Sequence, residues 1–119
     1  MPVLQTYSGG CHCGRVRYEV ETDLTPVVSC NCSICQKRGA LWTYVPAERF
    51  TLVSGTAELS DYQFNKRVIH HLFCRNCGTA SFARGMRSDG SEGISINIRC
   101  LDDIDLNALT PTEFDGRSL

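Results

Sequence analysis

The sequence lacks the features that mark membrane and nucleic-acid-binding proteins. No apolar run approaches the roughly 20 residues that a transmembrane helix needs. The sequence has twelve basic and thirteen acidic residues, which give a formal net charge of −1. The basic residues are scattered, the pairs being Arg15 with Arg17, Lys37 with Arg38 and Lys66 with Arg67. The absence of a basic stripe argues against nucleic acid as a partner, and no membrane partner is expected.

A secretory signal is also missing. Residues 1–5 show neither the basic region nor the apolar region of a signal peptide. We therefore expect a cytoplasmic, reducing location, where clustered cysteines are more often metal ligands than disulfides. The alternative for eight cysteines in a short chain is a secreted disulfide scaffold. The 119 residues leave room for one hydrophobic core, so a single domain over residues 1–119 is expected.

Strand signals dominate the sequence. Short runs rich in β-branched and aromatic residues alternate with turn residues, a pattern typical of antiparallel sheets. The expected strands are 15–20, 26–29, 41–45, 50–53, 57–64, 67–73, 79–83 and 94–98. Residues 33–38 predict one or two helical turns that end at Gly39. The chain is therefore expected to be mainly β, with one short helical turn.

Turn residues punctuate these strands. Ser54-Gly55 and Asn65-Lys66 each predict the turn of a hairpin. The Gly-, Ser- and Asp-rich residues 84–93 predict a loop. Three apolar residues beyond Leu101 are expected to anchor the chain to its core: Ile104, Leu106 and Leu109.

Cysteine spacing is the most informative feature that the sequence does have. Seven of the eight cysteines form three tight clusters, Cys11-His12-Cys13, Cys30-Asn31-Cys32-Ser33-Ile34-Cys35 and Cys74-Arg75-Asn76-Cys77. Cysteines one or two residues apart can point their sulfurs at one metal ion, but they are poorly placed to bridge distant segments. Four ligands close a structural zinc site, and three leave one position open. Seven clustered cysteines therefore predict two zinc ions of unequal character.

The spacing favours one division of these ligands. Cys74 and Cys77 follow an apolar strand and precede a glycine, which is typical of a zinc knuckle. Cys11 and Cys13 form a second two-ligand turn, also followed by glycine. We expect these four to bind a structural zinc. The alternative is that Cys11 and Cys13 join the second cluster.

Cys30, Cys32 and Cys35 then remain together. Three ligands within six residues can cap one face of a zinc and leave the fourth position for water or substrate. Because three thiolates donate much charge, such a metal is better suited to holding an incoming thiol as its thiolate than to polarising a carbonyl. The alternative is a second structural zinc whose fourth ligand is His12, His70, His71 or Cys100.

The remaining candidates have less specific signals. Cys100 follows a strand alone and is expected to be a small buried side chain outside the metal sites. His70 and His71 are consecutive in a strand, so they are expected to face opposite sides. Neither is assigned a role. Lys37 and Arg38 could bind a substrate carboxylate, although a solvated helix face is the commoner outcome.

With these residues in view, the chain resembles the family of glutathione-dependent formaldehyde-activating enzymes and centromere protein V. The matching segments are 9–14, 30–35, 55–62, 73–79, 97–101 and 114–117. The resemblance implies a β-tent fold, in which antiparallel sheets meet around zinc. It also implies a structural zinc on Cys11, Cys13, Cys74 and Cys77, and a catalytic zinc on Cys30, Cys32 and Cys35.

The resemblance further implies an activity. The named enzyme joins glutathione to formaldehyde to give S-hydroxymethylglutathione and is classed as a carbon–sulfur lyase. A small thiol such as glutathione is therefore the expected partner. The alternative is a zinc-stabilised module that binds protein or nucleic acid without catalysis, as the likeness to centromere protein V suggests.

Overall fold

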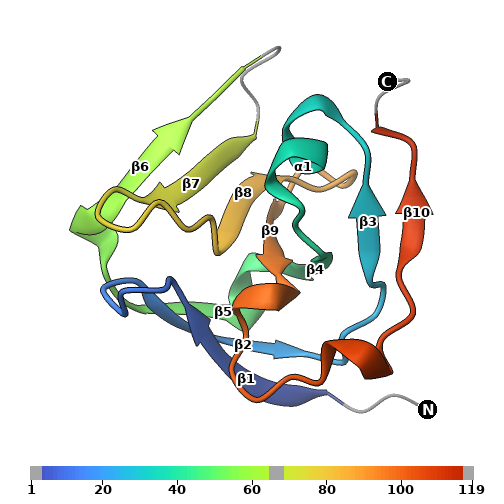
Figure 1. Cartoon of the computed structure of the whole chain (residues 1–119), viewed down its shortest axis with the longest axis horizontal. Helices are drawn as coiled ribbons and strands as arrows, with labels where there is room; N and C mark the ends of the chain where they lie inside the picture. Colours follow the sequence, from blue (N-terminus) through green and yellow to red (C-terminus); the bar gives the residue numbers. More distant parts are fainter. Residues whose placement is uncertain (1–3, 65–68, 117–119) are drawn as a thin grey trace.

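The computed structural model describes residues 4–64 and 69–116, which form two β-sheets (Figure 1). The three-stranded sheet has the order β1 (Gln5–Gly10), β2 (Arg17–Thr22), β5 (Phe50–Ser54). The seven-stranded sheet has the order β10 (Thr112–Phe114), β3 (Val28–Cys30), β4 (Trp42–Pro46), β9 (Glu92–Asn97), β8 (Phe82–Met86), β7 (His70–Cys74), β6 (Leu59–Tyr62). Neighbouring strands are antiparallel except β10 and β3, which are parallel. The prediction of a mainly β fold is confirmed.

The predicted helix is present with the predicted bounds. It is α1 (Ser33–Arg38), and it ends at Gly39, whose left-handed conformation (φ 69°) allows its N–H to bond to the carbonyl of Cys35. The described part of the chain also contains four single 3₁₀ turns: η1 (Ala47–Arg49), η2 (Thr56–Glu58), η3 (Ile98–Cys100) and η4 (Leu106–Ala108). Within residues 4–64 and 69–116, no helix is long and apolar enough to cross a membrane.

One predicted hairpin is wrong. Ser54-Gly55 does not join two paired strands, because β5 pairs with β2 and β6 pairs with β7 in the other sheet. Gly55 has φ 96° and packs closely on the backbone just before β2. A Cβ added at Gly55 would lie 2.7 Å from the Cα of Val16. The glycine therefore marks the crossing from one sheet to the other. The Asn65-Lys66 turn lies outside the described residues, although the strands on either side of it do pair as predicted.

Two strands were not predicted, and one loop was predicted too long. β1 is polar and ends in two glycines, and β10 has three exposed residues, so neither shows a hydrophobic pattern. β8 continues to Met86 and β9 begins at Glu92, which leaves only residues 87–91 as the turn of a hairpin. β10 is defined as a strand by its pairing with β3, far earlier in the chain, whereas β1 pairs with the next strand, β2, and β8 pairs with β9 in a hairpin.

The core lies between the two sheets. Tyr18 of β2 and Phe82 of β8 are each 1% exposed, and both rings pack on Phe50 of β5, with centroids 5.2 and 4.8 Å away. The Tyr18 hydroxyl donates a hydrogen bond to the carbonyl of Ser81 (3.0 Å), which satisfies its buried polar group. The predicted anchors pack against this core as expected: Ile104, Leu106 and Leu109.

A smaller apolar cluster fixes α1 on the seven-stranded sheet. Val28, Ala40 and Trp42 are buried together, and Cys35 of α1 packs against them. The helix therefore lies against β4 with its cysteine inward, at the end of β3. In this way the short helix is positioned by the same cysteine that belongs to the second cluster.

Candidate metal centres

The structure brings seven cysteine sulfurs together in two groups. Within each group all sulfurs lie within 4.8 Å of one another. The first group is Cys11, Cys13, Cys74 and Cys77, and the second is Cys30, Cys32 and Cys35. Cys11 and Cys13 thus lie with the Cys74 turn and not with the second cluster. All eight cysteines lie in the described residues, and none of them forms a disulfide.

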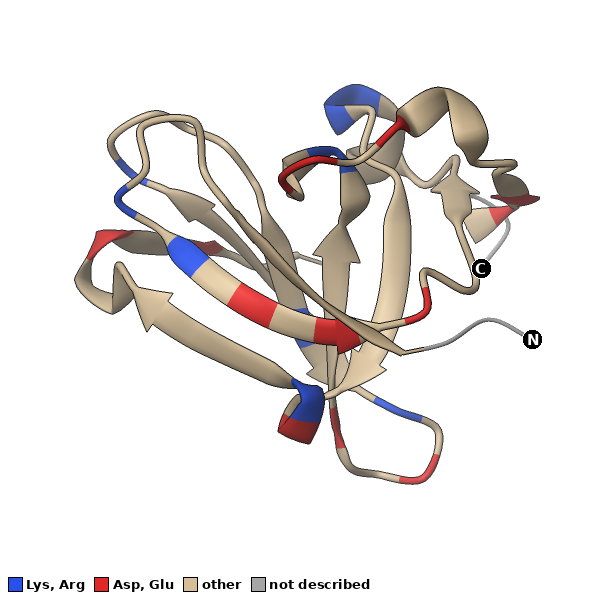
Figure 2. Cartoon of the chain, turned by 90° about the horizontal axis from the view of Figure 1, so that it is seen from below, with Lys and Arg blue, Asp and Glu red and all other residues tan. Residues whose placement is uncertain are grey.

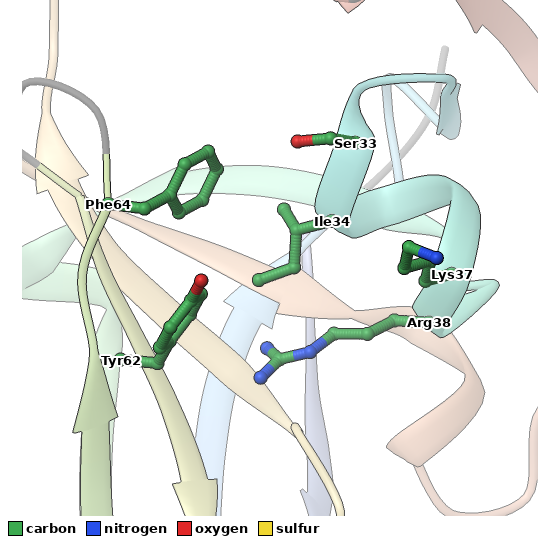
Figure 3. A pocket seen from close by; sticks show the side chains of 6 residues that line it. All are labelled: Ser33, Ile34, Lys37, Arg38, Tyr62 and Phe64. Carbon is green, nitrogen blue, oxygen red and sulfur yellow. The ribbon is translucent and has the colours of Figure 1, made fainter.

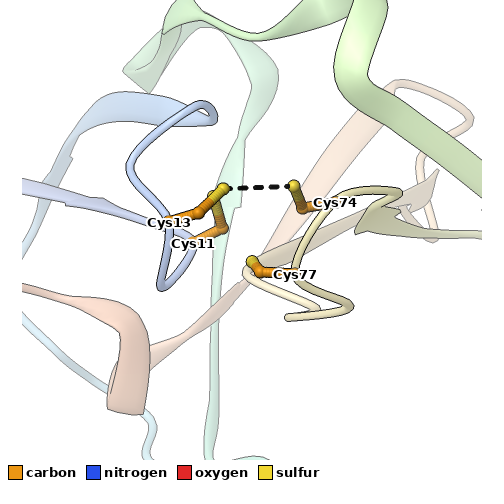
Figure 4. A group of neighbouring side chains, drawn as sticks. All are labelled: Cys11, Cys13, Cys74 and Cys77. Carbon is orange, nitrogen blue, oxygen red and sulfur yellow. Dashed lines mark hydrogen bonds between the residues drawn. The ribbon is translucent and has the colours of Figure 1, made fainter.

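The first group joins the two sheets. Cys11 directly follows β1 of the three-stranded sheet, whereas Cys74 is the last residue of β7 in the other sheet. Figure 4 shows the two turns facing each other, with the sulfurs pointing inward. The Cys74 turn is closed by a hydrogen bond from the N–H of Gly78 to the carbonyl of Cys74 (2.7 Å). Two local turns, 61 residues apart, therefore present four sulfurs to one point.

The sulfur separations fit a metal site. The Sγ atoms of Cys11 and Cys13 are 3.6 Å apart, and those of Cys13 and Cys74 are 3.7 Å apart. A tetrahedral zinc with bonds of about 2.3 Å holds its sulfurs about 3.8 Å apart, whereas disulfide sulfurs are bonded at about 2.05 Å. The geometry is that of ligands around a common centre and not of disulfides.

Hydrogen bonds reach the sulfurs of Cys11 and Cys77 in the first group. The backbone N–H of Val16 donates to the Sγ of buried Cys11 (3.3 Å). The hydrogen bond between Cys77 and the hydroxyl of Thr79 lowers the pKa of the Cys77 thiol to about 5. The thiolate, which is the ligand form of cysteine, is therefore favoured at Cys77.

The second group is built from one continuous segment. Cys30 ends β3, Cys32 precedes the first residue of α1 and Cys35 lies within the helix. The backbone N–H of Cys32 donates to the Sγ of Cys30 (3.4 Å). Among the described residues no histidine, carboxylate or further cysteine joins this group. The proposed fourth ligands, His12, His70, His71 and Cys100, thus lie elsewhere.

Trp42 is a neighbour of the second group that the sequence did not single out. It is 5% exposed, and its indole N–H donates to the Sγ of Cys35 (3.3 Å). Burial nevertheless raises the pKa of the Cys35 thiol to about 12. A cation that engages all three sulfurs would have to displace this proton.

The other residues that the sequence offered as possible ligands contact groups outside the two cysteine groups. The Sγ of Cys100 lies 4.0 Å from the carbonyl of Ala80, and burial raises the pKa of its thiol to about 11. The Nδ1 of His70 lies 2.7 Å from a carboxylate oxygen of Asp61. The ring of His71 stacks on that of Phe64 with centroids 5.2 Å apart. The two histidines therefore face opposite sides, as predicted.

A cleft of about 430 Å³ lies between α1 and the end of β6 (Figure 3). One wall is helical and contains Ile34, Lys37 and Arg38; the other is aromatic and contains Tyr62 and Phe64, whose rings stack 5.8 Å apart. Among the described residues, those that line the cleft include two cationic side chains, Lys37 and Arg38, and no carboxylate. The cleft therefore suits an anionic ligand. The sequence indicated the two cations but gave no signal for the aromatic wall.

The cleft and the second group of sulfurs lie on different sides of the same short helix. Cys35 faces Trp42 of β4, whereas Ile34 and Arg38 point toward Tyr62 (Figure 3). A ligand that occupies the cleft must therefore reach around part of the helix to contact the sulfurs.

Comparison with known proteins places this arrangement in a family. A family model described as glutathione-dependent formaldehyde-activating enzyme matches residues 6–114. The crystal structure of a protein from Rhodobacter sphaeroides is similar, with a TM-score of 0.78 and 31% sequence identity, over 89% of this chain and 97% of that one. The family match spans strands of both sheets and all seven clustered cysteines. The chain therefore belongs to the glutathione-dependent formaldehyde-activating enzyme family.

Proposed function

We propose that the chain is a zinc-dependent enzyme of the carbon–sulfur lyase type that acts on the adduct of a small thiol and an aldehyde. The family points to glutathione and formaldehyde, with S-hydroxymethylglutathione as the adduct. The observation that carries the proposal is the second cysteine group, which offers three sulfurs where a closed structural site has four. In the adduct-forming direction the thiol sulfur bonds to the carbonyl carbon, and the thiol proton is transferred to the oxygen.

Each cysteine group has its own part in this proposal. Cys11, Cys13, Cys74 and Cys77 would hold a structural zinc, and Cys30, Cys32 and Cys35 would hold a second one. The second zinc would supply stabilisation of the substrate thiolate. Around it, the chain holds the sulfur of Cys35 in place through the indole of Trp42.

The cleft supplies a place for the anionic part of the thiol substrate. None of the ion pairs among the described residues involves Lys37 or Arg38, and the Arg38 guanidinium lies 5.9 Å above the ring of Phe73. A thiol substrate with free carboxylates, such as glutathione, could place a carboxylate in the cleft while its sulfur approaches the second group.

The alternative of a nucleic-acid-binding module has less support. Figure 2 shows basic and acidic residues interspersed along the same elements. On β2, for example, Arg17 is followed by the exposed Glu19 and Glu21. Because nucleic acid binding relies on clustered positive charge, this distribution favours the enzyme.

The proposal can be tested by exchange NMR on glutathione mixed with formaldehyde. Adduct formation proceeds without a catalyst, so the quantity to measure is the exchange rate between free and adducted glutathione. The zinc-loaded protein is expected to raise that rate in proportion to its concentration. A rate that stays at the uncatalysed value with glutathione, cysteine and 2-mercaptoethanol would contradict the enzyme proposal and favour a binding module.

Substituting Arg38 by alanine is expected to raise the KM for glutathione about tenfold while leaving kcat nearly unchanged. A hydrogen bond to a charged group contributes about 1.5–3 kcal/mol, and the bond to a remote carboxylate is the same in the ground state and the transition state. Exposed Arg49, on η1, provides the matched control, Arg49→Ala. A loss confined to kcat, or equal effects of both substitutions, would contradict a binding role for Arg38.

Substituting Trp42 by phenylalanine is expected to lower the affinity of the second site for zinc about tenfold. The change keeps an aromatic ring but removes the N–H donor to Cys35, and removal of such supporting hydrogen bonds commonly costs 10–100-fold in metal affinity. Competition with a chromogenic chelator measures the affinity of each site. The first site, which Trp42 does not contact through this bond, is expected to keep its affinity.

A further inference from the structure

The segment Thr112–Gly116 runs directly beside the second cysteine group. β10 lies parallel to β3, with Phe114 opposite Cys30 in the register. The N–H of Thr112 donates to the carbonyl of Val27 (2.7 Å), and the N–H of Asn31 donates to the carbonyl of Phe114 (3.1 Å). A segment about 80 residues distant in sequence is thus aligned with the cysteines by a β-ladder.

The loop between Cys30 and Cys32 makes two hydrogen bonds to the Thr112–Gly116 segment. Asn31 lies between Cys30 and Cys32, and its side-chain amide also donates to the carboxylate of Asp115 (3.0 Å). Two hydrogen bonds therefore couple the loop between Cys30 and Cys32 to the Thr112–Gly116 segment.

Gly116 makes the closest approach to the sulfurs. A Cβ added at this position would lie 2.7 Å from the Sγ of Cys30 and 3.0 Å from the Cβ of Cys32. Its φ lies outside the left-handed region, so the requirement for glycine comes from space and not from backbone conformation. The bare backbone of Gly116 covers one side of the cysteine group, and any larger residue would push the Cys30 sulfur away.

We propose that the Thr112–Gly116 segment is part of the second metal site, and that Gly116 is a positioning residue that sets the place of the Cys30 sulfur. The inference rests on the proposed binding of metal by Cys30, Cys32 and Cys35. It adds that metal binding and docking of this segment are linked. Because the linkage is reciprocal, metal at the second site strengthens docking, and docking raises the affinity for metal.

The segment is suited to such a linkage because it contains a short, exposed edge strand. β10 is only three residues long, all three are exposed, and its ladder partner in the described chain is β3 alone. A short edge strand of this kind opens locally at a low free-energy cost. A metal that fixes Cys30 and Cys32 therefore changes the docking equilibrium of the segment by a measurable amount.

Substituting Gly116 by alanine tests the inference through metal content. With cobalt as the probe, absorption bands report thiolate-bound metal at each site. Gly116→Ala is expected to weaken binding at the second site at least tenfold and to leave the first site occupied. The matched control is Gly85→Ala on β8, where an added Cβ meets its nearest atom, Cγ1 of Ile69, at an ordinary 3.6 Å.

The outcomes separate this inference from the proposed function. Two cobalt ions bound with unchanged affinity in both the unsubstituted chain and Gly116→Ala would contradict only the positioning role. One cobalt ion in the unsubstituted chain would contradict the two-metal proposal and this inference with it. Retention of the first site in Gly116→Ala shows that the variant is folded.

Amide hydrogen exchange on the unsubstituted chain gives a second measurement. Occupancy of the second site is expected to slow exchange of the Thr112 and Asn31 amide protons several-fold, since both are bonded across the β10–β3 ladder. The chain with only the first site loaded is the reference. Exchange of these two protons that does not depend on the second metal would overturn the linkage.

Discussion

Substitution of Cys77 by serine is expected to leave the chain unfolded at 25 °C. Cys77 belongs to the group that joins β1 of one sheet to β7 of the other, and serine is a poor ligand for zinc. A structural zinc site contributes on the order of 10–16 kcal/mol of apparent binding energy at neutral pH. The whole stability of a domain is about 5–15 kcal/mol. Loss of the site therefore removes as much free energy as the folded state has.

Circular dichroism during heating measures this effect. The unsubstituted, metal-loaded chain is expected to show one cooperative transition, whereas Cys77→Ser shows none and has little near-ultraviolet signal from buried Tyr18. Cys100→Ser is the matched control, since Cys100 is the one cysteine outside both groups. A folded Cys77→Ser chain with a Tm within a few degrees of the unsubstituted protein would contradict a structural role for the first group.

Substitution of Cys32 by serine is expected to abolish activity in a chain that stays folded. The three sulfurs of the second group lie within one short segment, so they tie together no distant parts of the core. Removing one leaves two, which are too few to hold zinc against a competing chelator. The metal content is expected to fall from two ions per chain to one, and the exchange rate of glutathione with its adduct to the uncatalysed value.

Metal analysis, thermal unfolding and exchange NMR on the same sample check this expectation. The comparison with Cys77→Ser is decisive, because each variant removes one sulfur from one group. If both variants unfold to the same degree, the division into a structural and a catalytic site is wrong. If Cys32→Ser loses a metal but keeps full activity, the second group is not the site of the reaction.

Local sequence information was sufficient for the cysteine groups and for α1. The ligands of each turn are one or two residues apart, and the structure joins the Cys11 turn with the Cys74 turn as the spacing favoured. The bounds of α1 followed from Gly39, which ends the helix through its own backbone conformation. In these cases the residues that determine the structure are neighbours in sequence.

Features that depend on distant partners could not be predicted in this way. Ser54-Gly55 signals a change of direction but not which strands pair afterwards, so the predicted hairpin was wrong. β10 has no hydrophobic pattern, and its pairing with β3, far earlier in the chain, defines it as a strand. β1 was missed for a different reason, since its partner β2 is the next strand but its own residues are mostly polar or glycine. The aromatic wall of the cleft was missed because Tyr62 meets α1 only in the folded chain.

The two groups differ in when they can be completed during synthesis. The ribosome makes the chain from residue 1 onward, so the three sulfurs of the second group are all present once Cys35 has emerged. The first group needs Cys77, by which time β1, β2 and β5 have left the ribosome. The nascent chain therefore presents the three sulfurs of the second group before the four sulfurs of the first group are complete. The Thr112–Gly116 segment, with its contacts to Cys30, is added only after both.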